Sequence, residues 1–442
     1  MRRTQKIVRT VWAAALALGA LGTGAGGVHA VGTDTATVRP PVAVNQAAWA
    51  SSTDRQNAVI EYWTSEDMAL WNANNTDYGV DGPNYSNLDE GRIWSRAGAV
   101  HQTVGRLYYR QTLAWPSTTR PSRPEDAIGA VDSTQWLHVD SAGAYVPADT
   151  TAQHIFKDST TVTAVADGTT TTVRTVAYPT ECSANAVDSA NGSTILSAGH
   201  CVSNPLAVVA LGSLTGTIQK GSVSATDDAW MFIPGYDGTK VGLAQAPYGL
   251  WPATTAHTTA QWNDFTTLNP NTVNLSNFNY DVSALTVADP TRPGVRLTDV
   301  VGSQHVAFNQ PYNQTMFAFG YPNAGSWDTV STPVPAPGQT PGTTREIPRY
   351  RHDGRSLVEC NGNTWKDFIL KTDYEMTCNM TGGSSGGPWF QDFDPATGTG
   401  TQVGVNSTKY PNFVEGEGVW VIAPHFEDND QLLYNTVQNL TP

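Results

Sequence analysis

Residues Met380–Phe390 read MTGGSSGGPWF, with two adjacent serines among four glycines. Ser384 and Ser385 each satisfy the pattern Gly-x-Ser-x-Gly, which surrounds the reactive serine in many hydrolases. A serine hydroxyl becomes a strong nucleophile only when a nearby base takes its proton. The choice between the two serines, and the fold that presents them, therefore depends on where a histidine and an orienting carboxylate lie elsewhere in the chain.

A histidine and an aspartate occur in apolar runs upstream of these serines. His200 ends the run STILSAGH, in which small residues let the chain turn after a strand. Asp281 lies in YDVSALTV, and a carboxylate among apolar residues needs a partner that offsets its lost hydration. A histidine N–H can be that partner. One histidine among nine is by itself more often an ordinary core or surface residue, so His200 gains its significance from Asp281 and the serines.

The order of these groups along the chain separates two folds. Chymotrypsin-like peptidases run His, Asp, Ser, whereas α/β-hydrolases run Ser, Asp or Glu, His. An α/β-hydrolase also needs a helix directly after the serine, but Pro388 follows the glycines at once. The order His200, Asp281, Ser385 therefore favours an all-β chain over an α/β fold.

The pattern of the sequence after about Thr160 agrees with an all-β fold. The 442 residues include 40 Gly and 27 Pro, only 14% are charged, and the apolar runs are short and alternating. No helix-length pattern separates successive runs, which predicts an antiparallel barrel. The last run, DNDQLLYNTVQNL, predicts a short helix with Leu432, Leu433 and Val437 facing inward. The predicted strands are TTVTAV, TTTTVRTVAY, STILSA, AVVALG, YDVSALTV, TMFAFGYP, TQVGVNS and GVWVIAP.

Residues 1–30 predict a signal peptide. Four basic residues, Arg2, Arg3, Lys6 and Arg9, precede the apolar run VWAAALALGALG, and the sequence VHA that ends at Ala30 is a small-x-small cleavage site. A membrane anchor is the alternative, but the run is shorter than the roughly 20 residues that span a bilayer. We therefore expect a secreted, extracellular protein.

Charge and cysteines restrict the partners of the chain. The formal charge is −14, and loss of a basic signal peptide makes the remainder more acidic, which argues against nucleic acid or an anionic membrane as partner. Four cysteines in an exported chain indicate disulfides, with three possible pairings. Local pairing, Cys182 with Cys201 and Cys360 with Cys378, closes two short loops worth about 3 kcal/mol each. A zinc site is the competing interpretation, but no Cys-x-x-Cys motif supports it.

Several motifs together resemble the secreted chymotrypsin-like serine peptidases, and within them the bacterial glutamyl endopeptidase-like branch. SAGHC resembles the histidine motif and GGSSGGP the serine motif, and CSANAVDSANGSTILSAGHCV resembles that branch throughout. The likeness covers about Ile155 to Gln438, and EYWTSEDM upstream resembles the pro-segment of such enzymes. Further matches are FIPGYDGTKVGLAQAPYGLW, FGYP, DGRSLVEC and GVNS.

The resemblance implies two six-stranded antiparallel Greek-key β-barrels with a short C-terminal helix. It also implies a serine endopeptidase that acts on polypeptides by acyl transfer and needs no metal or cofactor, and we expect a monomer. The nucleophile is the serine directly before Gly-Gly-Pro, which is Ser385, with His200 as base and Asp281 as orienting acid. The backbone N–H groups of Gly383 and Ser385 form the oxyanion hole. Ser384 replaces an aspartate that pairs with the new N-terminus in animal digestive peptidases, so that ion pair cannot form.

The substrate pocket departs from the branch that the sequence resembles. Glutamyl specificity there depends on a histidine in the strand after the nucleophile and a threonine five residues before it. Here these places hold Asn406 and Met380. We therefore predict a neutral pocket, with a preference for uncharged side chains, lined by Asn379, Met380, Asn406 and Ser407.

Two questions stay open at this level. Residues 31–154 are predicted as a pro-region or accessory N-terminal segment and residues 155–440 as the peptidase domain, but HQTVGRLYY also resembles a first barrel strand and would place the domain start near His101. The alternative functions are a catalytically silent binding protein with the same barrels and a secreted esterase with the same triad. A silent protein has no physical need to retain all three triad residues, and rates on matched peptide and ester substrates separate the esterase.

Overall fold

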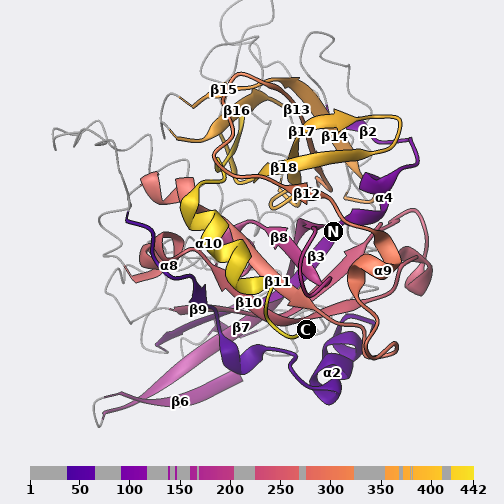
Figure 1. The fold of residues 1–442 in the computed structure, drawn as a ribbon. Coiled ribbons are helices and arrows are strands. Elements are labelled where there is room, and N and C mark those ends of the chain that lie inside the picture. The colour runs from indigo at the N-terminus through magenta and orange to yellow at the C-terminus, as the bar shows by residue number, and fades with distance from the viewer. Residues whose placement is uncertain are drawn as a thin grey trace, which may run out of the picture.

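The structure is a computed structural model in which two β-structures stack on each other. In Figure 1 the magenta to pink strands form the lower one, and the orange to yellow strands form the upper one. The residues that the structure describes are 37–64, 91–116, 138–139, 145–146, 160–166, 169–203, 224–267, 275–322, 354–367, 372–378, 380, 382–410 and 420–442.

Six strands form a closed barrel, here called the first barrel. They pair in the order β10-β11-β8-β7-β3-β9, and β9 pairs with β10 again, so the ladder closes on itself. Every pairing around the barrel is antiparallel. The strands are β3 (Val104–Pro116), β7 (Thr169–Ala186), β8 (Thr194–Ser197), β9 (Ser224–Pro234), β10 (Trp251–Thr258) and β11 (Ser283–Val287).

Apolar side chains fill the first barrel. Strands β8, β10 and β11 are buried at every position, because they face the core on one side and other elements on the other. Each large apolar side chain that is fully buried contributes about 1.5–3 kcal/mol relative to its exposed state. The core includes Leu107, Ile195, Trp230, Phe232, Trp251 and Leu285.

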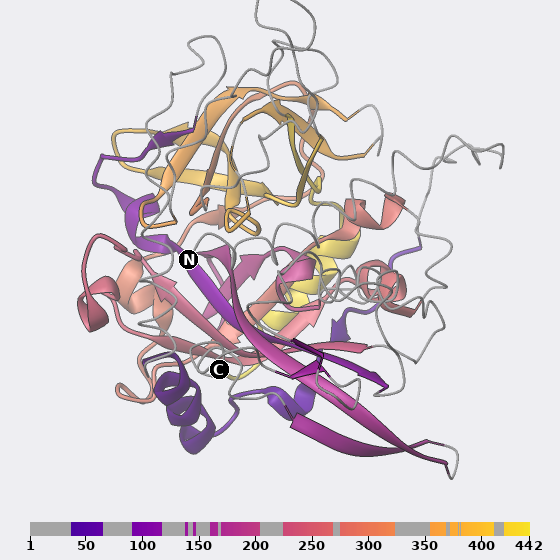
Figure 2. The ribbon, with the colours of Figure 1, turned by 180° about the vertical axis from the view of Figure 1, so that it is seen from behind.

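Strand β3 lies upstream of the predicted domain start at residue 155. It pairs with β7 on one side and with β9 on the other, so that Leu107 stands opposite both Cys182 and Phe232. The first barrel therefore takes one of its six strands from the segment predicted as a pro-region or accessory part, as the likeness of HQTVGRLYY to a barrel strand implies. Strand β6 (Thr160–Ala166) forms a hairpin with β7 that extends beyond the barrel (Figure 2).

Strands of two further sheets surround a second core, and we call them together the second barrel. One sheet has the order β12-β18-β17-β13-β14-β2 and the other β15-β16-β20-β19. Met316 and Trp389 from the first of these sheets pack in one cluster with Tyr374, Met376 and Val421 from the other. The strands are β2 (Arg92–Ile93), β12 (His305–Val306), β13 (Thr315–Gly320), β14 (Val358–Asn363), β15 (Trp365–Lys366), β16 (Tyr374–Thr377), β17 (Pro388–Asp394), β18 (Thr399–Val405), β19 (Thr408–Tyr410) and β20 (Trp420–Ala423).

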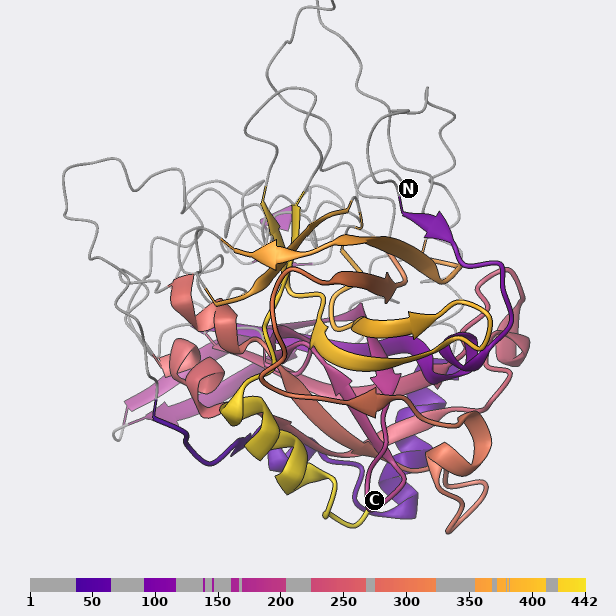
Figure 3. The same cartoon turned by 45° about the horizontal axis from the view of Figure 1, so that its top comes forward.

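One pairing of the second barrel departs from the antiparallel pattern. Strand β12 runs parallel to β18, with His305 opposite Thr401, because it belongs to the segment that leads from the first barrel into β13. At the other edge of this sheet, β2 pairs with β14. Figure 3 shows β2, in purple, beside the orange strands.

The predicted C-terminal helix is α10 (Asp428–Val437), which lies across the first barrel in Figure 1. Leu433 and Val437 are fully buried in its core, as predicted, and Leu432 is partly buried.

Across the described part of the chain, no helix combines the length and apolar character needed to cross a bilayer. The other elements are β1 (Val42–Ala43), β4 (His138–Val139), β5 (Tyr145–Val146), α2 (Thr53–Thr64), α4 (Ala99–Thr103), α8 (Ala260–Thr267), α9 (Leu297–Val301), and the 3-10 helices η2 (Gln46–Ala48), η5 (Gly199–Cys201), η6 (Gly242–Gln245) and η7 (Leu275–Tyr280).

Two upstream segments pack on the barrels. In residues 37–64, strand β1 pairs with β10, and Trp63 in α2 is 1% exposed and donates from Nε1 to Ala229 O at 2.6 Å. In residues 91–103, the Trp94 N–H donates to Leu357 O of the second barrel at 2.8 Å. The upstream chain therefore contacts both barrels.

The first and last described parts of the chain meet beside α8. The Arg39 backbone N–H donates to Asn429 Oδ1 at 3.1 Å. Gln261 Nε2 donates to the same oxygen at 2.7 Å and to Thr37 O at 3.3 Å. The Arg39 guanidinium also pairs with Asp264 in α8. Helix α8 thus contacts both the segment at residues 37–39 and, through Gln261, Asn429 in α10.

The predicted fold class is confirmed, and the strand runs agree with it. TTVTAV forms β6, TTTTVRTVAY begins β7, and STILSA, YDVSALTV, TMFAFGYP, TQVGVNS and GVWVIAP contain β8, β11, β13, most of β18 and β20. The run AVVALG lies outside the described residues.

Candidate active site

His200 lies in η5, directly after β8, in a turn with little freedom. A Cβ on Gly199 would lie 2.8 Å from the Trp262 ring and 3.0 Å from Asp281 Oδ1, so only glycine fits. On the other side of His200, Cys201 is bonded to Cys182 of β7. The turn is therefore packed before the histidine and cross-linked after it, which fixes the backbone that carries the imidazole.

A buried hydrogen bond joins His200 to Asp281. Asp281 Oδ2 lies 2.7 Å from His200 Nδ1, and Asp281 Oδ1 accepts the backbone N–H of His200 at 2.7 Å. The aspartate is 0% exposed and the histidine 3%. Because a carboxylate only accepts hydrogen bonds, Nδ1 carries the proton and Nε2 is the basic nitrogen. The arrangement is an imidazole base in a fixed orientation.

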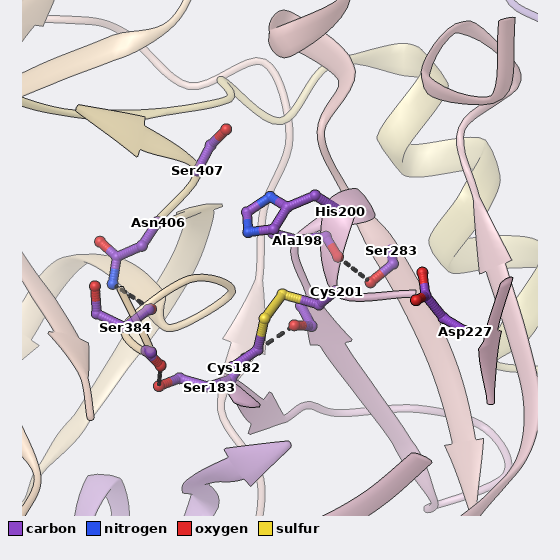
Figure 4. Close-up of a disulfide and its surroundings, with 12 residues drawn as sticks. Cys182, Ser183, Ala198, His200, Cys201, Asp227, Ser283, Ser384, Asn406 and Ser407 are labelled. Carbon is purple, nitrogen blue, oxygen red and sulfur yellow. Dashed lines mark hydrogen bonds between the residues drawn. A yellow bond between two sulfur atoms is a disulfide. The ribbon is translucent and has the colours of Figure 1, made fainter. Parts of the chain in front are cut away.

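Ser407 supplies a further donor to the same carboxylate. Its Oγ donates to Asp281 Oδ2 at 2.6 Å. Ser407 follows β18, so the second barrel helps to orient an acid of the first. Figure 4 shows the imidazole of His200 beside Ser407 and next to the disulfide. The sequence predicted Ser407 as a pocket residue, whereas its hydroxyl contacts the acid.

Asp228 and Asp264 are two of the four aspartates that lie between His200 and Asp281 in the sequence, and each has a partner other than His200. Both carboxylate oxygens of Asp228 accept from Arg110 at 2.7 Å. Asp264 pairs with Arg39 at 2.5 Å. Asp281 is therefore the acid of the three that the structure brings to His200.

A further buried acid lies in the second barrel within electrostatic range of Asp281. Asp373 is 0% exposed. Burial, and after it the neighbouring Asp367, raises the pKa of Asp373 well above its ordinary value. The raised pKa favours the neutral form of Asp373, which adds no second negative charge near Asp281.

Ser384 and Ser385 lie in the loop before β17, and each is 5% exposed. Gly383 and Gly386 in this loop have φ of 92° and 80°, which residues with a Cβ rarely adopt. A Cβ on Gly387 would lie 1.9 Å from Phe319 O. The glycines of the motif are thus required by the backbone path around the serines.

Two links tie the serine loop to the turn that carries His200. The Ser183 N–H donates to Ser385 O at 2.6 Å. Ser183 follows Cys182, and the disulfide partner of Cys182 is Cys201, which directly follows His200. The structure therefore brings His200, Asp281 and the serine loop to one place between the barrels, where sequence reasoning predicted a triad. Ser183 was missed, because a serine after a half-cystine carries no recognisable signal.

The three other predicted pocket residues have different surroundings. Asn379 lies outside the described residues. Met380 is buried, with its N–H 3.4 Å from Cys378 Sγ. Asn406 is 2% exposed, and its amide is hydrogen-bonded within the protein at the back of the serine loop. The pocket roles of Met380, Asn406 and Ser407 stay predictions.

Both disulfides of the local pairing are present, Cys182–Cys201 and Cys360–Cys378. Within the described residues, Cys182, His200 and Cys201 form a group whose ligand atoms are close enough together for a metal ion. Zinc binds cysteine as thiolate. Because the two sulfurs are bonded to each other, this group does not fit a zinc site.

The relation of these groups to the two barrels decides the fold. A closed first barrel supplies the His200–Asp281 pair, the second barrel supplies the Gly-Ser-Ser-Gly-Gly-Pro loop, and the two meet between the barrels. The chain has a chymotrypsin-like fold. The predicted resemblance to the chymotrypsin-like peptidases is thereby confirmed for the architecture.

The solved structures to which this chain is similar include several proteases. No protein-family model and no curated protein matched it. The protease Anisep from Arthrobacter nicotinovorans is 27% identical, over 63% of this chain and 94% of that one, with a TM-score of 0.40. A thermostable serine protease, AL20, from an extremophilic microorganism is 26% identical, over 60% and 93%, with a TM-score of 0.42. A Glu endopeptidase is 15% identical, over 59% and 86%, with a TM-score of 0.36.

Proposed function

We propose that the protein is a secreted serine endopeptidase in which Ser385 is the nucleophile, His200 the general base and Asp281 the orienting acid. The observation that carries this proposal is the buried hydrogen bond of 2.7 Å between His200 Nδ1 and Asp281 Oδ2, beside a glycine-flanked serine. An oriented imidazole next to a serine has the parts that acyl transfer requires. The two disulfides support export to an oxidising compartment.

In the first half-reaction the Ser385 Oγ bonds to the scissile carbonyl carbon while its proton passes to His200 Nε2. Asp281 stabilises the resulting imidazolium through the Nδ1–H, and Ser407 keeps the carboxylate in place. The N–H groups of Gly383 and Ser385 stabilise the negative oxygen of the tetrahedral intermediate. His200 then gives its proton to the amine as the C–N bond breaks, which leaves an ester on Ser385.

Water completes the second half-reaction by the same route. It adds to the ester carbonyl while His200 Nε2 takes its proton. The bond from carbon to Ser385 Oγ then breaks, the proton returns to that oxygen, and the new carboxyl group leaves. Every step uses groups of this chain and its substrate, with His200 alternating between base and acid.

A peptide library tests this function and its specificity together. We expect the secreted protein to cleave after uncharged residues and poorly after glutamate, because Met380 is apolar and both N–H groups of the Asn406 amide already donate to protein carbonyls. An unpaired buried carboxylate costs on the order of several kcal/mol. Mass spectrometry of the digest, with and without a fluorophosphonate inhibitor, gives the measurement.

Each outcome of this digest points to a different conclusion. Strong cleavage after glutamate would contradict the predicted neutral pocket but would still agree with the proposed peptidase function. Rapid hydrolysis of matched esters without peptide cleavage identifies an esterase. Absence of both activities identifies a binding protein with the same barrels.

We also propose that the upstream residues 37–103 stay in the active enzyme as an accessory segment and are not a removed pro-region. The support is the packing of β1, Trp63 and Trp94 on the two barrels. We expect N-terminal sequencing and the intact mass of the active secreted protein to place its start before Arg39. An active chain that begins after Thr64 would contradict this proposal.

The variant Trp63→Ala should measure how much this packing contributes to the free energy of unfolding. The loss of a fully buried Trp lowers the free energy of unfolding by about 3–5 kcal/mol. Val241→Ala is the control, because Val241 is 89% exposed and its loss leaves stability almost unchanged. Denaturant unfolding of the secreted protein compares the two. Equal effects would show that the upstream segment does not support the barrels.

A further inference from the structure

Three consecutive carbonyl groups of the serine loop are held by hydrogen bonds. Ser183 Oγ donates to Gly383 O at 2.8 Å, and the Ser183 N–H donates to Ser385 O at 2.6 Å. Asn406 Nδ2 donates to Ser384 O at 3.0 Å. Figure 4 shows Ser183 and Asn406 on either side of Ser384.

These contacts fix the peptide planes around Ser385. A trans peptide is planar, and its C=O points opposite to the N–H of the next residue. Holding the Ser384 carbonyl therefore sets the direction of the Ser385 N–H. The held carbonyls of Ser384 and Ser385 belong to the two peptide planes that flank the Ser385 Cα, which leaves its φ and ψ little freedom. The position of the Ser385 Cβ, which carries Oγ, follows from the same constraint.

The two side chains that hold the loop are themselves locked. Ser183 is 0% exposed, and its Oγ accepts the Tyr321 N–H at 2.9 Å. Asn406 uses its other N–H to donate to Phe319 O at 2.8 Å. Its Oδ1 accepts Trp389 Nε1 at 2.7 Å. A side chain with all of these partners keeps one rotamer, so it can transmit a fixed position to the loop.

We infer that Ser183 and Asn406 are positioning residues for Ser385. Ser183 comes from β7 of the first barrel and Asn406 follows β18 of the second, so the loop is held from both barrels. Neither side chain reaches the reacting atoms: the Asn406 amide holds the peptide plane that carries the Ser385 N–H, and the Ser183 hydroxyl holds the preceding plane through Gly383 O. This inference rests on the proposed function of Ser385 as nucleophile.

The rate of fluorophosphonate labelling tests the inference. In this reaction the Ser385 Oγ bonds to phosphorus, fluoride leaves and the hydroxyl proton passes to His200. Rates at several probe concentrations separate the maximal labelling rate from probe affinity. We expect Ser183→Ala and Asn406→Ala each to lower the maximal rate on the order of 10- to 100-fold, short of the roughly 100- to 1,000-fold loss when an oxyanion donor is removed. Probe affinity should change little.

Ser193→Ala is the matched control. Ser193 is 1% exposed, its Oγ accepts the Leu297 N–H at 3.2 Å, and it lies at the opposite end of β8 from His200. Loss of a buried hydroxyl lowers stability at either serine, which thermal unfolding records. Of these two serine variants, only Ser183→Ala should slow fluorophosphonate labelling.

Wild-type labelling rates in Ser183→Ala and Asn406→Ala, or an equal loss in Ser193→Ala, would overturn the inference and leave the proposed function standing. A wild-type protein that is never labelled would remove the proposed function and the inference with it. If Ser183→Ala does not fold, Asn406→Ala decides, because it releases a different carbonyl of the same loop.

Discussion

Ser385→Ala abolishes fluorophosphonate labelling and peptide cleavage, whereas Ser384→Ala leaves both largely intact. Ser385 alone directly precedes the Gly-Gly-Pro sequence, and its backbone is tied to Ser183 beside the His200 turn. Ser384 packs instead against the end of β13, where a Cβ on Gly320 would lie 2.8 Å from the Ser384 Cβ. Labelling of the full-length and processed protein, followed by mass spectrometry of the labelled peptide, locates the adduct.

Ser384→Ala is the matched control for this experiment, since it removes an equally buried hydroxyl from the neighbouring position. Labelling that survives Ser385→Ala and disappears in Ser384→Ala would reverse the assignment. Thermal unfolding of both variants shows that each is folded when it is assayed.

Asp281→Asn lowers the rate of peptide hydrolysis by about four orders of magnitude with little loss of stability. An asparagine can keep its oxygen on the His200 N–H and place its amide nitrogen where Oδ2 now lies. That nitrogen donates to Nδ1, so the ring proton moves to Nε2 and the base is lost. Ser407 Oγ, now a donor to Oδ2, can accept from the amide instead. The measurement is kcat/KM on a peptide that the library identifies.

Asp228→Asn provides the comparison for the acid. Asp228 is partly exposed and pairs with Arg110 away from His200. A surface pair of this kind contributes about 0–1 kcal/mol to stability, and its loss should leave kcat/KM near the wild-type value. A mild effect of Asp281→Asn beside a severe effect of Asp228→Asn or Asp264→Asn would show that another acid orients the histidine.

The groups proposed for catalysis could be located from the sequence because close packing restricts the residue types around them. A Cβ on Gly199 would meet the Trp262 ring and Asp281, and a Cβ on Gly387 would meet Phe319 O, so both motifs need glycine although these partners are distant in the sequence. Asp281 could be chosen because it lies in a run of apolar residues that must be buried. The disulfide pairing could not be derived, because spacing alone allows three pairings and only the fold selects one.

Strand β3 was harder to recognise for a physical reason. It is hydrogen-bonded on both edges, and Leu107, Tyr108 and Tyr109 are all buried. A strand that is buried on both faces shows no alternation of polar and apolar residues. The periodicity that predicted the other strands is therefore absent at this one, and only its likeness to a barrel strand indicated it.

Asn406 and Ser407 show a second limit of sequence reasoning. Adjacent residues of an extended chain point to opposite sides. Ser407 contacts Asp281 and Asn406 contacts the back of the serine loop. The direction of each side chain depends on how β18 is oriented in the second barrel. The local sequence motif carries no information about that orientation.

The contact between Arg39 and Asn429 beside α8 makes the docking of the N-terminal segment depend on α10. Arg39 and Asn429 are 390 positions apart, yet they share a hydrogen bond. Contacts between such distant positions form late, because closing a long loop loses much chain entropy before any contact repays it. The N-terminal segment therefore has no complete docking site until α10 has been synthesised. A chain cut short before α10 would lose that helix and also release the segment at its opposite end, so proteolysis near residue 39 should report on an intact C-terminus.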